Sequence, residues 1–175
     1  MTLKQINFLQ INLQGCRLAQ DLLWRTTAER DIGIAIVSEP YNVSGVPGWY
    51  TDWTGWAAVG FPDGMVVPKE VEQGDGFVAV RLGACTVYSC YISPNCIPSE
   101  YTAFLNHLAA SLFRRRDQPL IVAGDFNAKS EEWQARRTDQ QGYKVGEWLA
   151  DMQLQVCRWE ILLLNTTMVL ALELM

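Results

Sequence analysis

Four polar residues of this sequence directly follow apolar runs, where they could hold a metal ion or a phosphate. Asn12 follows INFLQI, Glu39 follows IGIAIVS, and Asp125 and Asn127 follow LIVAG. In layered α/β folds, ligands favour the crevice beyond the ends of the strands. Amide and carboxylate oxygens are hard ligands, which suit Mg²⁺ or Mn²⁺ rather than zinc. We therefore expect a divalent-cation site that could polarise a phosphoryl oxygen.

The apolar pattern predicts the elements that must position these side chains. Strands are expected over residues 4–13, 32–37, 56–60, 76–82, 85–93, 119–127 and 154–157. Helices are expected over residues 16–31, 98–116 and 138–152. The short gap between the strands at 76–82 and 85–93 predicts a hairpin. Hairpin strands mixed with helices indicate a layered α/β sandwich rather than a doubly wound parallel sheet.

Composition sets limits on the chemistry. The 175 residues carry 14 Lys and Arg against 19 Asp and Glu, a net charge of −5, which argues against a broadly cationic coat for nucleic acid. The five cysteines include no C-x-x-C pair and indicate a reducing compartment. His107 is the only histidine, so one chain cannot build a two-histidine zinc site. The apolar segment 161–172 is too short and too polar to cross a bilayer, so no membrane association is expected.

Four sequence words carry a family resemblance: QINLQG, VSEP, YISPN and GDFNAKS, in this order and each at an expected strand end. Together they resemble the endonuclease/exonuclease/phosphatase superfamily, and within it the apurinic-type endonuclease domain of non-LTR retrotransposons. The resemblance implies an incomplete four-layered α/β sandwich of the DNase I-like type, with mixed sheets flanked by helices. It also implies a nuclear, Mg²⁺- or Mn²⁺-dependent phosphodiesterase that nicks a DNA target strand, so that reverse transcription can prime there.

The resemblance gives each candidate site residue a role. Glu39 would be a direct metal ligand, and Asn12 would help to bind the ion. Tyr91 would share a proton beside the scissile phosphate. Asp125 would orient or deprotonate the attacking water, and Asn127 would stabilise the charge on a phosphate oxygen.

Other residues are candidates for contacts with DNA. The resemblance places Asn95 at the border of the nucleic acid, and Lys129 and Arg136 follow the site loop, where they could contact the phosphate backbone. We expect a solvated helix end at Arg114, Arg115 and Arg116, with contacts to phosphates as the alternative. Trp49, Trp53 and Trp56 are interpreted as loop packing, with base stacking as the alternative.

Each site residue also has a structural alternative. Asn12 could cap the following turn or helix, and Glu39 could be a solvated loop carboxylate. Tyr91 could serve packing alone. Asp125 and Asn127 could form an Asx-turn after their strand.

The sequence departs from the family pattern after GDFN. The family closes on a Ser-Asp-His word, which this sequence does not contain, and His107 lies too early, within a predicted helix. We therefore expect a partial domain at residues 1–157, through truncation or a frameshift, then a non-family hydrophobic tail at 158–175, and crippled activity. The alternatives are a non-catalytic remnant of the domain and a small-molecule phosphoesterase of the same superfamily.

Overall fold

The computed structural model describes residues 6–62, 64 and 66–156, which form two four-stranded sheets. Sheet A contains β1 (Asn7–Asn12), β2 (Ile32–Ser38), β3 (Trp49–Thr51) and β4 (Ala57–Gly60). Sheet B contains β5 (Glu70–Gln73), β6 (Phe77–Arg81), β7 (Thr86–Tyr91) and β8 (Leu120–Asp125). The helices are α1 (Arg17–Glu29), α2 (Pro98–Arg114) and α3 (Gln140–Met152), with a short 3-10 turn at Glu131–Trp133.

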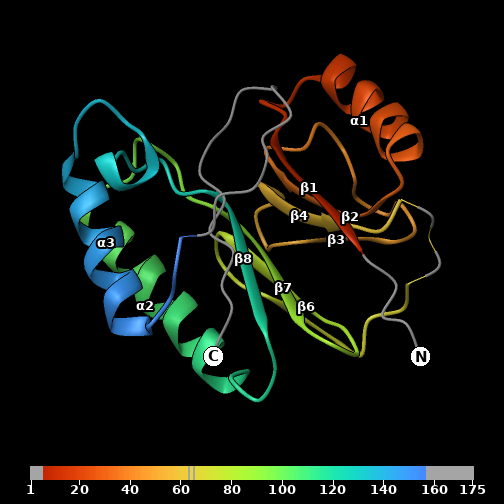
Figure 1. Ribbon diagram of the computed structural model, residues 1–175. Coiled ribbons are helices and arrows are strands. Elements are labelled where there is room, and N and C mark those ends of the chain that lie inside the picture. The colour runs from red at the N-terminus through yellow and green to blue at the C-terminus, as the bar shows by residue number, and fades with distance from the viewer. Residues whose placement is uncertain (1–5, 63, 65, 157–175) are drawn as a thin grey trace.

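Both sheets are mixed. In sheet A the strand order is β1-β2-β4-β3, with β1 parallel to β2 and the other pairs antiparallel. In sheet B the order is β5-β6-β7-β8: the first three strands form an antiparallel meander, and β8 lies parallel to β7. Figure 1 shows the two sheets stacked, with α1 on the outside of sheet A and α2 and α3 on the outside of sheet B. The layered α/β sandwich predicted from the sequence, with mixed sheets flanked by helices, is therefore confirmed.

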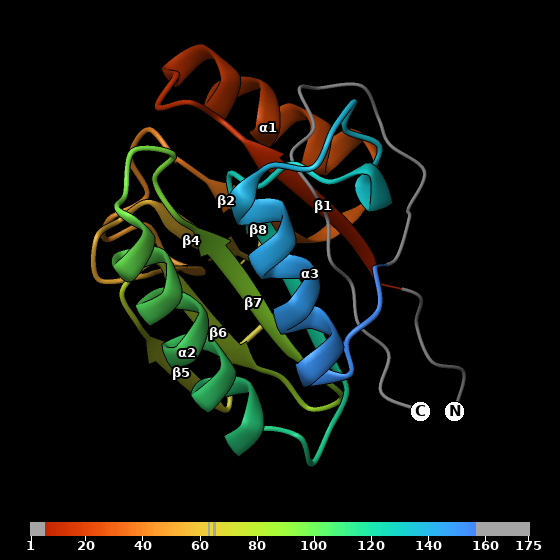
Figure 2. The ribbon, with the colours of Figure 1, turned by 90° about the vertical axis from the view of Figure 1, so that its left-hand side faces the viewer.

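Three hydrophobic clusters hold these layers together. The cluster between the sheets joins residues such as Ile36 and Val59 of sheet A to Val80 and Val87 of sheet B. A second cluster fills the space between sheet B, α2 and α3, the two neighbouring helices that Figure 2 shows side by side. The third packs α1 against sheet A. Each helix therefore covers one outer sheet face, and the site is left to the strand ends.

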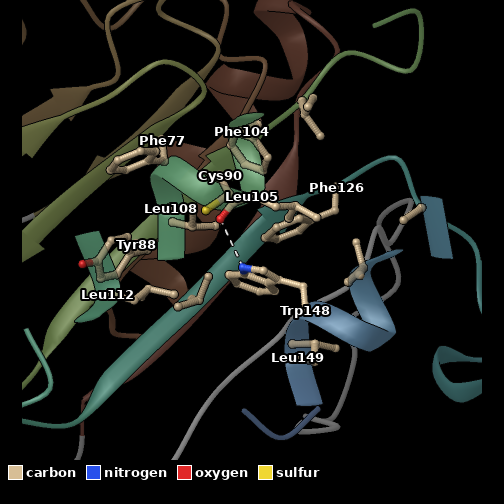
Figure 3. Packing of buried hydrophobic residues seen from close by; sticks show 14 of the residues in the cluster. Phe77, Tyr88, Cys90, Phe104, Leu105, Leu108, Leu112, Phe126, Trp148 and Leu149 are labelled. Atoms are coloured by element: carbon tan, nitrogen blue, oxygen red, sulfur yellow. Dashed lines mark hydrogen bonds between the residues drawn. The ribbon is translucent and has the colours of Figure 1, made fainter. Parts of the chain in front are cut away.

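Trp148 connects the two helices that cover sheet B. Its ring packs near Phe126, and its indole Nε1 donates a hydrogen bond to the Leu105 carbonyl at 3.1 Å (Figure 3). The indole nitrogen is the one polar atom of this side chain, so the bond lets Trp148 be buried without an unsatisfied donor.

The chain after α3 corrects one prediction. Residues 154–156 form no strand, and Cys157 lies outside the described residues. Gln153 adopts a left-handed conformation with φ of 58°, and the Leu154 N–H donates to the Leu149 carbonyl, so the chain turns back against the end of α3. The tail predicted at 158–175 also lies outside the described residues, and the domain boundary at 157 stays a prediction.

The sequence missed β3, β5 and the 3-10 turn. β5 has the sequence EVEQ and lies at the edge of sheet B, where its side chains are largely exposed. An edge strand pairs with only one other strand and leaves its side chains exposed, so it needs no apolar run that the sequence could show. None of the helices formed by the described residues has the length and apolar run that a membrane crossing requires.

The predicted solvated helix end at Arg114–Arg116 is wrong for Arg115. This side chain is buried, and its guanidinium pairs with Glu70 and Glu72 of β5. The missed strand explains the error, because β5 supplies the two carboxylates that make burial of the charge possible. His107 lies within α2, as predicted, and is exposed there.

Candidate active site

The ends of four strands meet at one edge of the sandwich. Asn12 ends β1 opposite Ser38 of β2, and Tyr91 ends β7 opposite Asp125 of β8. Because the two sheets are stacked, residues 113 positions apart in sequence come into contact here. The structure brings Asn12, Glu39 and Asp125 together at these strand ends, and their role as a site stays a prediction.

A single amide bridges the two carboxylates. Asn12 Nδ2 donates to Glu39 Oε1 at 2.9 Å and to Asp125 Oδ2 at 2.7 Å. The Gln14 N–H donates to Asn12 Oδ1 at 2.8 Å, which turns the NH₂ group toward the carboxylates. Asn12 therefore caps the turn and belongs to the site at once, and it faces the carboxylates as a donor.

Asp125 is buried at the centre of this arrangement. Its Oδ1 accepts a hydrogen bond from the Asn127 N–H at 3.0 Å, which forms the Asx-turn considered as the structural alternative, and its Oδ2 remains directed at Asn12. Burial raises the pKa of Asp125; the hydrogen bonds from Asn127 and Asn12 oppose this rise, and the charge of Glu39 adds to it. Among the described residues, no Lys or Arg forms an ion pair with Asp125 or Glu39. The two acidic groups are thus compensated only by neutral donors.

Glu39 is held in an uncommon backbone conformation. Its φ is 48°, in the left-handed region, which costs on the order of 1 kcal/mol for a residue other than glycine. Two hydrogen bonds fix it: the Glu39 N–H donates to the Trp56 carbonyl at 2.7 Å, and the Gly15 N–H donates to the Glu39 carbonyl at 2.9 Å. This tether aims the carboxylate across the sheet edge at Asn12.

Tyr91 lies beside both acids. Burial, the charges of Glu39 and Asp125, and a hydrogen bond with Glu39 raise the pKa of Tyr91 to about 12. Its ring also stacks on the Trp56 indole, with 5.7 Å between centroids and 24° between planes. Tyr91 therefore stays protonated near neutral pH and can donate its hydroxyl proton in a hydrogen bond.

Gly124 lets β8 reach its position. Its φ is 148°, and a Cβ on this residue would lie 1.9 Å from the Cys90 carbonyl oxygen of β7. Only glycine allows this approach. Glycine at this position thus allows β7 and β8 to pair closely, and this pairing places Tyr91 next to Asp125.

Two buried serines were not recognised from the sequence. Ser38 Oγ donates to the Cys90 carbonyl at 3.2 Å, and Ser89 Oγ donates to the Val37 carbonyl at 3.1 Å. These bonds join β2 of sheet A to β7 of sheet B, one residue before Glu39 and close to Tyr91. Each serine lies within an otherwise apolar strand. Because a buried hydroxyl needs a hydrogen-bond partner, this position could have indicated a contact with another strand.

The remaining predicted residues lie in the loops around the site. Asn127 has a φ of 45°, and its Nδ2 donates to the Ile92 carbonyl at 2.9 Å. Asn95 is exposed in the loop after β7, and Lys129 and Arg136 are exposed between β8 and α3. Within the described part of the chain, no hydrogen bond links Asn95, Lys129 or Arg136 to the two carboxylates.

Comparison with known proteins shows which proteins have a similar sequence or fold. A family model described as endonuclease-reverse transcriptase matches residues 85–161. The endonuclease domain of TRAS1, a telomere-specific non-LTR retrotransposon, is 26% identical with a TM-score of 0.69, over 86% of this chain and 73% of that chain. The chain is thus similar, in fold and in part of its sequence, to endonuclease domains of the endonuclease/exonuclease/phosphatase superfamily. No curated protein matches its sequence.

Two more distant structures share the superfamily fold. The 3′ phosphatase NExo from Neisseria, solved with a product DNA hairpin, is 14% identical with a TM-score of 0.64, over 87% of this chain and 73% of that chain. An AP endonuclease from Archaeoglobus fulgidus is 11% identical with a TM-score of 0.65, over 87% of this chain and 72% of that chain. At these identities the likeness concerns the fold.

The donor set of the site fits a hard divalent cation. No group of three or more His, Cys, Asp or Glu side chains suited to a metal gathers among the residues described. The site instead offers Glu39 and Asp125, held close by a neutral amide. Mg²⁺ is commonly bound through one or two carboxylates together with waters and substrate phosphate. Two uncompensated carboxylates meet that requirement.

Proposed function

We propose that this domain hydrolyses phosphodiester bonds of DNA with the help of Mg²⁺ or Mn²⁺, as the target-nicking endonuclease of a retrotransposon. The observation that carries the proposal is the pair of carboxylates, Glu39 and Asp125, bridged by Asn12 with no cationic partner among the described residues. Like charges held together in this way favour a divalent cation and its phosphate ligand over a structural role. The likeness to the TRAS1 endonuclease domain supports DNA as the substrate.

In this proposal, separate residues bind the ion and activate the attacking water. Glu39 would be the direct ligand of the ion, with Asn12 beside it. When bound, the ion would polarise a phosphoryl oxygen and stabilise the charge of the leaving group. Asp125 would orient or deprotonate the attacking water, a task that suits a carboxylate of raised pKa.

Tyr91 and Asn127 would act on the phosphate itself. The protonated hydroxyl of Tyr91 can donate to a phosphate oxygen. Asn127 Nδ2 donates one hydrogen bond to Ile92, and its second N–H remains available to an oxygen that gains charge in the transition state. Asn95, Lys129 and Arg136 would contact the DNA backbone from the surrounding loops.

We further propose that the 175-residue chain alone is a weak nuclease. Its sequence contains no Ser-Asp-His word, and His107 is exposed on α2. A missing acid-base group typically lowers the rate of proton transfer by about 10²–10⁴-fold. A DNA substrate would make the host nucleus the working compartment.

A plasmid-nicking assay tests the enzymatic proposal. Supercoiled DNA is incubated with the chain and Mg²⁺, and conversion to the open circle is followed with increasing protein concentration. We expect slow nicking that Asp125→Asn abolishes and that Asp151→Asn, which changes an exposed acid on α3, leaves intact. Absence of nicking at every concentration favours the non-catalytic remnant. Turnover of a soluble phosphoester without nicking favours the small-molecule phosphoesterase.

A calorimetric titration with Mg²⁺ tests the metal site independently of activity. We expect Glu39→Gln to weaken Mg²⁺ binding strongly, because it removes the charged ligand and keeps the shape. Glu29→Gln is the matched control, since Glu29 is exposed at the end of α1. Identical isotherms for the wild type and Glu39→Gln would refute the site.

A further inference from the structure

The loop between β3 and β4 is wound around one buried carboxylate. Asp52 is 2% exposed, and its Oδ2 accepts hydrogen bonds from the Thr54 N–H at 3.2 Å, the Thr54 hydroxyl at 2.5 Å and the Gly76 N–H at 3.2 Å. Its Oδ1 accepts from the Ala57 N–H at 3.0 Å. With both oxygens engaged, the loop has a fixed conformation that anchors it to sheet B.

This fixed loop presents two tryptophans to solvent. Trp53 is 73% exposed and Trp56 is 49% exposed, whereas Trp49 is 8% exposed and packs in the core beneath α1. The predicted loop packing is therefore right for Trp49 and wrong for Trp53 and Trp56. These exposed indoles do not contribute to the packing of the hydrophobic core. Large exposed apolar groups commonly mark binding sites.

Trp56 is coupled to the candidate active site. One face of its indole stacks on Tyr91, and its carbonyl accepts the Glu39 N–H at 2.7 Å. Although its ring stacks on Tyr91, Trp56 keeps 49% of its surface exposed. A phosphate held at Glu39 and Asp125 would therefore place its own nucleoside beside this indole.

We propose that the exposed surface of Trp56 receives an unstacked nucleobase next to the phosphate bound at the site. This inference rests on the proposed function and adds a base-binding subsite to it. A flat, uncharged aromatic face suits a base, because every base has a π-face, and stacking on it is tolerant of sequence. The Tyr91 ring behind the indole and the Asp52 loop hold the platform in place before the strand arrives, which reduces the entropy lost on binding.

The test compares strands with and without bases. In an Asp125→Asn background, which prevents cleavage, binding of a fluorescein-labelled oligothymidylate and of an abasic strand of equal length is measured by anisotropy with Mg²⁺. We expect Trp56→Ala to weaken binding of the oligothymidylate by about tenfold or more and that of the abasic strand by less than about twofold. Trp56→Phe, which keeps a π-face, should stay within about threefold of the parent.

Two further variants keep the test decisive. Trp56→Leu retains apolar bulk without a π-face and should behave like Trp56→Ala, so that unfolding of the alanine variant does not stop the comparison. Phe113→Ala is the matched control, because Phe113 is 67% exposed at the far end of α2, and its loss should change neither affinity.

The outcomes separate the two proposals. Equal losses on both strands, or no loss on either, would overturn the base subsite and leave the nuclease proposal standing. Failure of the parent protein to bind either strand would also overturn the base subsite, whereas the nuclease proposal would fail only if the wild type did not nick the plasmid.

Discussion

Two polar clusters of this domain differ in how their charges are balanced. In the first, the Arg115 cluster, the buried guanidinium pairs with Glu70 and Glu72, and Ser111 Oγ donates to Glu72 at 2.9 Å. In the second, the candidate active site, two carboxylates share the neutral amide of Asn12. Glu72 lies toward the start of β7, since its neighbour Ala79 pairs with Tyr88, whereas the active site lies at the end of the same strand.

The difference shows which kind of polar cluster marks function. The Arg115 cluster opposes every carboxylate with a cation, as a structural ion-pair network requires. The active site keeps like charges together and holds Glu39 and Asn127 at positive φ. Uncompensated charge combined with strained backbone is the signature of a site that stores free energy for a ligand. Density of polar groups alone would not separate the two clusters.

The largest expected effect comes from removing the backbone contact on which the active site depends. Gly124→Ala would place a Cβ against the Cys90 carbonyl, so we expect a loss of about 4 kcal/mol or more in the free energy of unfolding, or failure to fold. Urea denaturation measures the loss. Gly146→Ala is the control: among the described residues, no atom outside its own helix backbone and chain neighbours lies within 4 Å of the Cβ position, and helix propensity favours alanine. Equal stability of both variants would contradict the packing of β8 on β7.

The next effect breaks the compensated cluster. Arg115→Met leaves Glu70 and Glu72 without their buried cation, and we expect a loss of about 2–3 kcal/mol, because Glu70 is partly solvated and softens the penalty. Mg²⁺ binding at the active site should not change. Arg116→Met, at an exposed position, should alter stability by less than about 0.5 kcal/mol. A change in the Mg²⁺ isotherm of Arg115→Met would mean that the two clusters are coupled.

A smaller effect follows from removing the bridging amide. Asn12→Ala takes the shared donor from Glu39 and Asp125, and we expect a loss of about 1 kcal/mol in stability without metal. Saturating Mg²⁺ should recover part of this loss, since binding to the folded state stabilises it. Thermal melts with Mg²⁺ and with a chelator measure both. Asn106→Ala on the exposed face of α2 should show no Mg²⁺-dependent difference from the wild type.

The smallest expected loss of stability comes from neutralising Glu39, and the same change at Glu72 gives a direct contrast between the two clusters. Glu39→Gln removes one of two like charges and keeps an oxygen for Asn12, so we expect stability within about 0.5 kcal/mol of the wild type. The same change at Glu72 removes the partner of Arg114 and Arg115 and should cost about 1–2 kcal/mol. Parallel urea titrations compare the two variants. Equal losses would show that the active site is balanced like a structural cluster.

Most of the fold could be predicted from local pattern. Buried strands such as β2 and β8 carry continuous apolar runs, and α2 shows the spacing of an amphipathic helix. β5 could not be predicted, since an exposed edge strand is defined by its pairing with β6 and not by its own side chains. The segment 154–156 could not be assigned correctly either, because the end of α3 turns it back toward the helix.

For the site, the local sequence pattern was enough to place Asn12, Glu39 and Asp125 at the ends of apolar runs, whereas Tyr91 entered through the family resemblance. A strand end is a local property, set by where an apolar run stops, so these positions were readable. Three features could be known only from the folded structure. They are the direction of the Asn12 amide, the burial of Arg115, and the exposure of Trp56 in contrast to the burial of Trp49. Each depends on a partner distant in sequence or on one backbone N–H, because sheet stacking and hydrogen bonding fix which groups meet.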